Sequence, residues 1–141
     1  MENLNFSIKI GIKRHNEECN KIYPAIINIL INSMTDETVV LIIFVPETHA
    51  DLVRETLGKA GAGHIGNYAV CSYSVRGTGR FLPMKNANPA IGKIGTLEEV
   101  LEERIETVCY RKDVKKIIDE IKKIHPYEEP VIYVQQLLET S

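Results

Sequence analysis

The stretch 61–80, GAGHIGNYAVCSYSVRGTGR, holds several residue types that could do chemistry. Gly61, Gly63 and Gly66 fit the G-x-G-x-x-G pattern that binds a dinucleotide, which requires a strand before the glycines and a helix after them. Here the order is reversed, because a helical pattern ends at Gly61 and a strand pattern begins near Tyr68. We therefore interpret these glycines as a tight turn between a helix and a strand, and we exclude a dinucleotide site at this position.

A divalent metal is a second possibility, because His64, Cys71, His125 and Glu128 are all ligand types. The predicted topology puts His64 and His125 in loops at opposite ends of one sheet, so they could share a metal only across a subunit boundary. The alternative is that His64 hydrogen-bonds the backbone of its turn, and we favour this alternative. A divalent metal is thus the one cofactor that the residues leave open.

A third candidate site contains the two arginines of the segment RGTGR, Arg76 and Arg80. The glycines between them predict a hairpin turn, and RFLP would begin the return strand. The expected topology places this turn beside Tyr127 and Glu128. The arginines could pair with nearby glutamates or present a fork to a carboxylate or phosphate ligand, and we favour the ion pairs. No Ser–His–acid or Cys–His pair can be ordered into a triad, so we assign no catalytic residue.

Periodicity predicts the elements that must position these residues. Residues 39–46 are apolar without alternation, which suits a central strand covered on at least one face. Apolar residues at helical spacing predict helices near 49–60 and 112–124. Further strands are predicted near 69–75, 105–109 and 131–137, with an irregular segment at 84–101.

This order, β-α-β-β-α-β, predicts an α+β fold, a ferredoxin-like sandwich. One antiparallel sheet in the spatial order 4-1-3-2 would carry both helices on one face. We expect two parts: an N-terminal strand-helix extension at 1–38 and the ferredoxin-like domain at 39–141. In the extension, FSIKIGI at 6–12 reads as a strand, and a helix would begin near 21–24.

Composition limits the class of protein. With 141 residues, 44% of them hydrophobic and 26% charged, the chain suits a single soluble domain. A net charge of −2 argues against a nucleic-acid binder that neutralises phosphates, and no apolar run reaches the ~20 residues that span a bilayer. The start resembles no signal peptide and the three cysteines suggest no disulfide framework, so we expect a cytoplasmic protein with reduced thiols.

Four segments in a fixed order resemble a known family: GAGHIGNYAVCSYSVRGTGRFLP, NANPAIGKIGTLEEV, ERIETV and HPYEEPVIYV. Over residues 39–137 they look like the inserted domain of the NGG-interacting-factor-like (YqfO) family, whose members are often described as dinuclear-metal-centre proteins or type-two GTP cyclohydrolase homologues. That inserted domain is similar in fold to the CutA divalent-ion tolerance proteins and to PII-like signalling proteins, which are trimers. HPYEEP also resembles the segment before the last strand of CutA.

The resemblance implies a function as well as a fold. In the family, the two metals are held by histidines and acids of flanking domains, which this sequence does not contain. We therefore expect a stand-alone, non-catalytic module with a binding or regulatory role. It would form a homo-oligomer, most simply a trimer through its edge strands, and bind a small molecule or a protein. The alternative is a CutA-like divalent-metal-binding protein with ligands at subunit boundaries, and a small enzyme at the arginine hairpin is a third hypothesis.

Overall fold

The computed structural model describes residues 24, 26–27 and 37–137. The strand predicted at 6–12 and most of the predicted helix that follows it lie outside the described residues. The chain divides into two units, Met1–Ser33 and Met34–Ser141. All that follows concerns the second unit.

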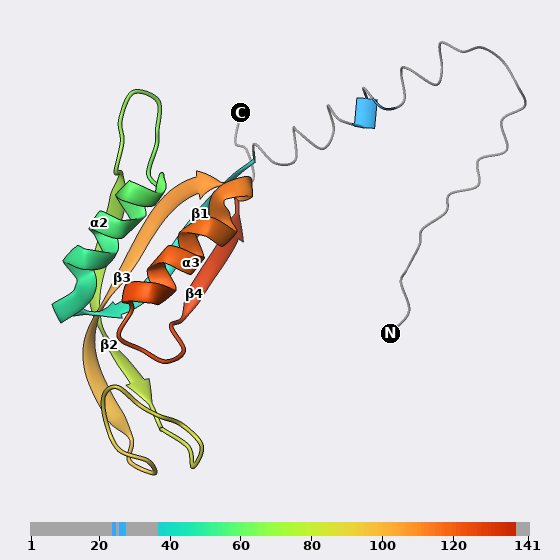
Figure 1. The fold of residues 1–141 in the computed structure, drawn as a ribbon. Helices are drawn as coiled ribbons and strands as arrows, with labels where there is room; N and C mark the ends of the chain where they lie inside the picture. The colour runs from blue at the N-terminus through green and yellow to red at the C-terminus, as the bar shows by residue number, and fades with distance from the viewer. Residues whose placement is uncertain (1–23, 25, 28–36, 138–141) are drawn as a thin grey trace, which may run out of the picture. The chain divides into compact units, whose positions relative to one another are not determined.

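The second unit is a four-stranded antiparallel sheet with two helices. Its elements are β1 (Thr38–Pro46), the 3-10 turn η1 (Glu47–His49), α2 (Ala50–Ala60), β2 (Ser72–Phe81), β3 (Glu98–Tyr110), the 3-10 turn η2 (Arg111–Asp113), α3 (Val114–Ile124) and β4 (Ile132–Gln136). The strand order is β2-β3-β1-β4, and both helices cover the same face (Figure 1). The predicted α+β ferredoxin-like fold and its 4-1-3-2 order are confirmed. Within the described part of the chain, neither helix is long and apolar enough to cross a membrane.

The core lies between the sheet and the helices. Alternate residues of β1 point to the helices because side chains alternate along a strand. These β1 residues meet buried side chains of β3, α2 and α3. Ile42, on the other face of β1, is also buried, which explains why the run 39–46 shows no alternation in the sequence. Apart from three alanines, the buried set is Val39, Leu41, Ile43 and Val45 of β1, Val53 and Leu57 of α2, Ile105 and Cys109 of β3, and Ile117 and Ile121 of α3.

The prediction of a hairpin turn at RGTGR is wrong. β2 continues through this segment to Phe81, and the return strand β3 begins only at Glu98, so residues 98–101 are strand rather than irregular. Gly77 and Gly79 do not adopt positive φ, and both pair with β3 as extended backbone. A Cβ at Gly79 would instead collide with the carboxylate of Glu102, so that this side chain, which Tyr127 holds by a hydrogen bond, would have to shift.

The glycine segment before β2 is a turn, as interpreted. Gly61 ends α2 in the left-handed region at φ 99°, where a side chain would be strained. Gly63 has φ 82°, and its N–H donates to the Val108 carbonyl at 2.7 Å. Its own carbonyl accepts from Cys71 N–H at 2.9 Å, which fixes the entry into β2.

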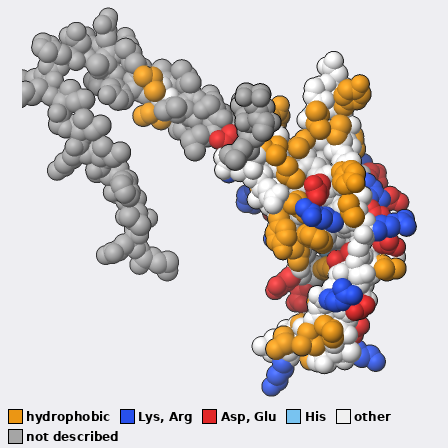
Figure 2. Space-filling model, turned by 180° about the vertical axis from the view of Figure 1, so that it is seen from behind, with side chains coloured by type: hydrophobic (Ala, Val, Ile, Leu, Met, Phe, Trp, Pro, Cys, Tyr) orange, Lys and Arg blue, Asp and Glu red, His pale blue; other side chains and the backbone are white. Residues whose placement is uncertain are grey.

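The described residues leave the sheet face opposite the helices open. Tyr73 and Val75 of β2 and Tyr133 of β4 point to this side, with 68%, 48% and 55% of their surface exposed. The view from behind shows hydrophobic side chains gathered in groups among charged ones (Figure 2). In this unit, apolar surface is therefore left exposed on one face of the sheet.

Candidate functional site

A cavity of about 660 Å³ lies between the connection 82–97 and the segment 127–133. The sheet supplies one wall and these two segments supply the others. We call it the β2–β3 loop cavity. Its lining is Phe44 of β1; Gly79, Arg80 and Phe81 of β2; Leu82, Pro83, Met84, Asn86, Ala87, Pro89, Ala90 and Ile91 of the connection; Glu102 of β3; Tyr127, Glu128, Glu129 and Val131; and Tyr133 of β4.

Glu102 is the most buried charged group of this cavity, with 8% of its surface exposed. Glu102 is three residues before Ile105 in β3, and side chains alternate along a strand. Because Ile105 points into the core, Glu102 points to the open face. The Tyr127 hydroxyl donates a hydrogen bond to Glu102 Oε1 at 2.6 Å. Burial, together with this carboxylate, raises the pKa of Tyr127 well above its usual value, so the hydroxyl stays protonated and remains a donor.

His125 anchors the segment that carries Tyr127. The Tyr127 backbone N–H donates to His125 Nδ1 at 3.1 Å, and His125 Nε2 lies 3.0 Å from the Phe44 carbonyl oxygen. Nδ1 is thus an acceptor and Nε2 carries the proton, which is the neutral imidazole. Burial lowers the pKa of His125, which favours the same neutral form. Both ring nitrogens of His125 are therefore engaged with the backbone of the same chain.

Glu128 joins the two segments that form the mouth of the cavity. Its Oε2 accepts a hydrogen bond from the Asn88 backbone N–H at 2.9 Å. The next residue, Glu129, is exposed and pairs with no cation among the described residues. The mouth of the cavity therefore presents carboxylates.

The two predicted arginines are both paired with glutamates. Arg80 Nε lies 2.7 Å from Glu99 Oε1, and Arg76 Nε lies 3.5 Å from Glu47 Oε1. Of the four predicted ligand-binding residues, three (Arg80, Tyr127 and Glu128) line the same cavity, whereas Arg76 is outside its lining. The ion pairs that the sequence led us to favour are present. Their glutamates are Glu47 and Glu99, and not the glutamates that follow His125.

The residues considered for a metal are not brought together within the described chain. His64 is exposed in the turn after α2, Cys71 precedes β2, and His125 is held by the backbone as described above. Among the described residues, no group of three or more His, Cys, Asp or Glu side chains is placed to hold a metal ion. Sharing of His64 and His125 across a subunit boundary stays a prediction.

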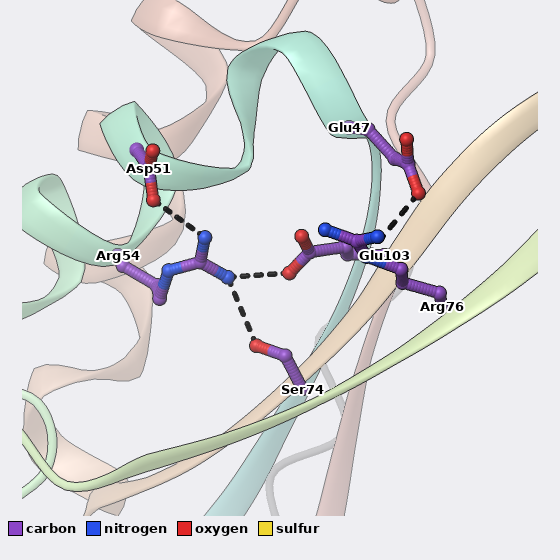
Figure 3. Close-up of polar contacts among 6 residues, drawn as sticks. All are labelled: Glu47, Asp51, Arg54, Ser74, Arg76 and Glu103. Carbon is purple, nitrogen blue, oxygen red and sulfur yellow. Dashed lines mark hydrogen bonds and ion pairs between the residues drawn. The ribbon is translucent and has the colours of Figure 1, made fainter.

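A second polar cluster, on the helix side of the sheet, fastens α2 to β2 and β3 (Figure 3). Arg54 Nη1 donates to Glu103 Oε2 at 2.5 Å and to Ser74 Oγ at 3.0 Å, and its Nη2 donates to Asp51 at 2.6 Å. These hydrogen bonds, first to Asp51 and then to Glu103, raise the pKa of Arg54. The cluster is separate from the lining of the β2–β3 loop cavity, and we assign it a structural role.

Comparison with known proteins relates the chain to a family of longer proteins. No protein-family model matches it. The proteins named GTP cyclohydrolase 1 type 2 homolog are 49% identical to it in Halalkalibacterium halodurans, over 74% of this chain and 28% of that protein, and 45% identical in Bacillus subtilis, over 72% and 27%. The chain thus spans about a quarter of the length of the curated relatives it matches.

Solved structures agree with this relationship. A Bacillus cereus protein related to NIF3 superposes with a TM-score of 0.64 at 44% identity, over 72% of this chain and 26% of that protein. The periplasmic divalent cation tolerance protein CutA from Archaeoglobus fulgidus superposes with a TM-score of 0.54 at 16% identity, over 74% and 87%. The second likeness establishes the fold alone. The chain is therefore homologous to one part of the proteins named GTP cyclohydrolase 1 type 2 homolog, and that part has the CutA-like fold.

Proposed function

We propose that the chain is a non-catalytic binding or regulatory module that associates with copies of itself. The observation that carries this proposal is the β2–β3 loop cavity. Small-molecule sites are usually concave, of about 300–1,000 Å³, and mostly apolar with a few placed polar groups. The cavity has a volume of about 660 Å³ and an apolar and aromatic lining that includes three carboxylates.

The polar groups of the cavity support binding rather than catalysis. Among the described residues that line the cavity there is no Ser, Thr, Cys, His or Lys, so only its glutamates and tyrosines could act as nucleophile or base. The Tyr127 hydroxyl is bound to Glu102 and stays protonated. We therefore propose that the chain does not turn over GTP, although its relatives carry a name that refers to this reaction.

The proposed self-association follows from the two edges of the sheet. β2 and β4 are the edge strands, and open edges offer unpaired N–H and C=O groups that native proteins cover or pair. β4 and the residue after it contain no lysine, and Tyr133 and Leu137 have 55% and 45% of their surface exposed. Pairing of β2 of one subunit with β4 of the next would close a ring, and we propose a trimer.

Cys71 and Cys109 are free thiols in the structure. Free thiols persist in reducing compartments. They support the proposal that the module works in the cytoplasm.

A thermal-shift screen at fixed protein concentration tests the binding function. We expect a ligand of the β2–β3 loop cavity to raise the melting temperature of the wild-type chain but not that of Ala90→Trp, which fills the cavity from an exposed lining position. Ile94→Trp is the matched control, because Ile94 is exposed on the same connection but is not part of the lining. Ligands that stabilise both variants equally would contradict binding in this cavity.

Two further measurements test the other parts of the proposal. Chromatographic assay of GTP with added Mg²⁺, Mn²⁺ or Zn²⁺ should show no turnover, and turnover that Glu102→Gln abolishes would contradict the non-catalytic role. Light scattering at micromolar concentration should give about three times the single-chain mass of 15.9 kDa. A mass equal to that of one chain would contradict self-association.

A further inference from the structure

The β2–β3 loop cavity presents mainly one sign of charge. Glu102, Glu128 and Glu129 line it, whereas Arg80 is its only cation among the described residues. The guanidinium of Arg80 is paired with Glu99, which is not part of the lining, at 2.7 Å. The lining therefore carries three carboxylates against one guanidinium that already has an anionic partner.

Glu102 is the carboxylate that we expect to attract a bound cation most strongly, because it is buried whereas Glu128 and Glu129 are exposed. Its side chain accepts one hydrogen bond, from Tyr127, and pairs with no cation among the described residues. A carboxylate offers about four acceptor positions, so Glu102 keeps free acceptor capacity at the cavity wall. A buried charge is costly unless it is paired, so a ligand cation placed beside Glu102 would offset part of this cost.

Aromatic rings provide a complementary surface for the same kind of ligand. Phe44 and Tyr133 pack edge to face with centroids 5.8 Å apart, and Phe81 and Tyr127 with centroids 5.9 Å apart. All four rings line the cavity. Ring faces attract cations. The Arg104 guanidinium carbon already lies 6.0 Å from the Phe44 centroid, so a ligand would use the other three rings.

Carboxylates and aromatic rings around one cavity are the chemistry that holds organic cations. We infer that the β2–β3 loop cavity binds a small organic cation, an amine or an amidinium or guanidinium compound, with its charge beside Glu102 and its apolar body against the aromatic rings. This inference rests on the proposed binding function and names the class of ligand. A nucleotide or a carboxylate is the wrong class, because its negative charge would face the three glutamates.

The direct test is calorimetric titration with benzamidine, benzamide and benzoate, which share a ring and differ in charge. We expect benzamidine to bind at least about tenfold more tightly than benzamide, and benzoate to bind least. Glu102→Gln keeps an acceptor for Tyr127 and should weaken benzamidine binding by about tenfold, with little change for benzamide. Glu55→Gln is the control, because it removes the same charge at an exposed pair on α2.

A second variant keeps the test decisive if Glu102→Gln fails to fold. Glu129 is exposed, so Glu129→Gln should leave the fold intact and weaken benzamidine binding by about threefold. Equal affinities for benzamidine and benzamide, or wild-type affinity in both glutamine variants, would overturn the inference. Absence of benzamidine binding at millimolar concentration would also overturn it. If benzoate or a nucleotide binds instead and Ala90→Trp blocks it, the binding function stands and only the ligand class fails.

Discussion

Replacement of Arg54 by methionine tests how the helix layer is fastened to the sheet. Arg54 donates to Glu103 at 2.5 Å and to Ser74 at 3.0 Å, and the Glu103 side chain is only 11% exposed. Removal of one partner of a fully buried ion pair costs about 3–5 kcal/mol, because the remaining charge is left unpaired in a poorly solvated place. Arg54 itself is 29% exposed, so water can partly solvate Glu103 in the variant. We therefore expect Arg54→Met to lower the free energy of unfolding by about 2–3 kcal/mol.

Urea unfolding followed by circular dichroism, at one protein concentration, measures this loss. Lys59→Met is the matched control, because the Lys59–Glu55 pair also lies on α2 but its side chains are 74% and 59% exposed. We expect the control to cost less than about 0.5 kcal/mol. The double variant Arg54→Met with Glu103→Gln should recover about 1 kcal/mol or more of the loss, since no charge is left unpaired. An Arg54→Met loss no larger than the control's would refute this reasoning.

Three further predictions concern the glycines of β2 and two buried titratable groups. Gly79→Ala should lower the melting temperature more than Gly77→Ala, because a Cβ at Gly79 would collide with Glu102 whereas the space around Gly77 is open; thermal unfolding of the two variants compares them. Burial lowers the pKa of His125 below its unfolded value of 6.5. The stability that the neutral imidazole contributes is therefore present above pH 6.5 and declines as the pH falls through and below that value. Proton NMR of the imidazole should therefore give a titration midpoint below 6.5, and a midpoint above it would contradict the neutral anchor. Burial raises the pKa of the Cys109 thiol to about 11, so iodoacetamide should leave it unlabelled in the native protein at mildly alkaline pH and label it in urea, as peptide mass spectrometry would show.

The fold was largely predictable because its strongest signals are local. The apolar run 39–46 indicated a central strand, and the helical spacing of apolar residues located both helices to within a few residues. The prediction of a turn at RGTGR was wrong because glycine serves two purposes that look alike in a sequence: it permits a positive φ, and it leaves space for a neighbouring side chain. At Gly79 the absent Cβ makes room for a neighbouring side chain, and no positive φ is required.

The candidate site was only partly predictable. Arg80, Tyr127 and Glu128 were expected to lie near one another, because the order of the elements places their segments at one end of the sheet. Glu102 was missed. The alternation of LEERIETV places it on the face opposite Ile105, but its burial depends on Tyr127, which is distant in sequence.

The connection 82–97 was also missed as part of the site. Its composition predicts an irregular segment, which is correct, but irregular composition does not say where the segment folds. The hydrogen bond from Asn88 to Glu128 ties the connection to the segment 127–133, and it joins residues 40 apart in the chain. Such contacts follow from tertiary structure and leave no periodic pattern.

The central claim is that this module binds ligands in the β2–β3 loop cavity, and amide chemical-shift mapping tests it most directly. The labelled wild-type chain would be titrated with benzamidine and with each compound that raises its melting temperature. We expect the shifted amides to lie in residues 79–91 and 127–133, which form most of the lining, and Ala90→Trp to abolish the shifts. Shifts confined to other parts of the module, such as residues 61–71, or no shift with any compound, would contradict it.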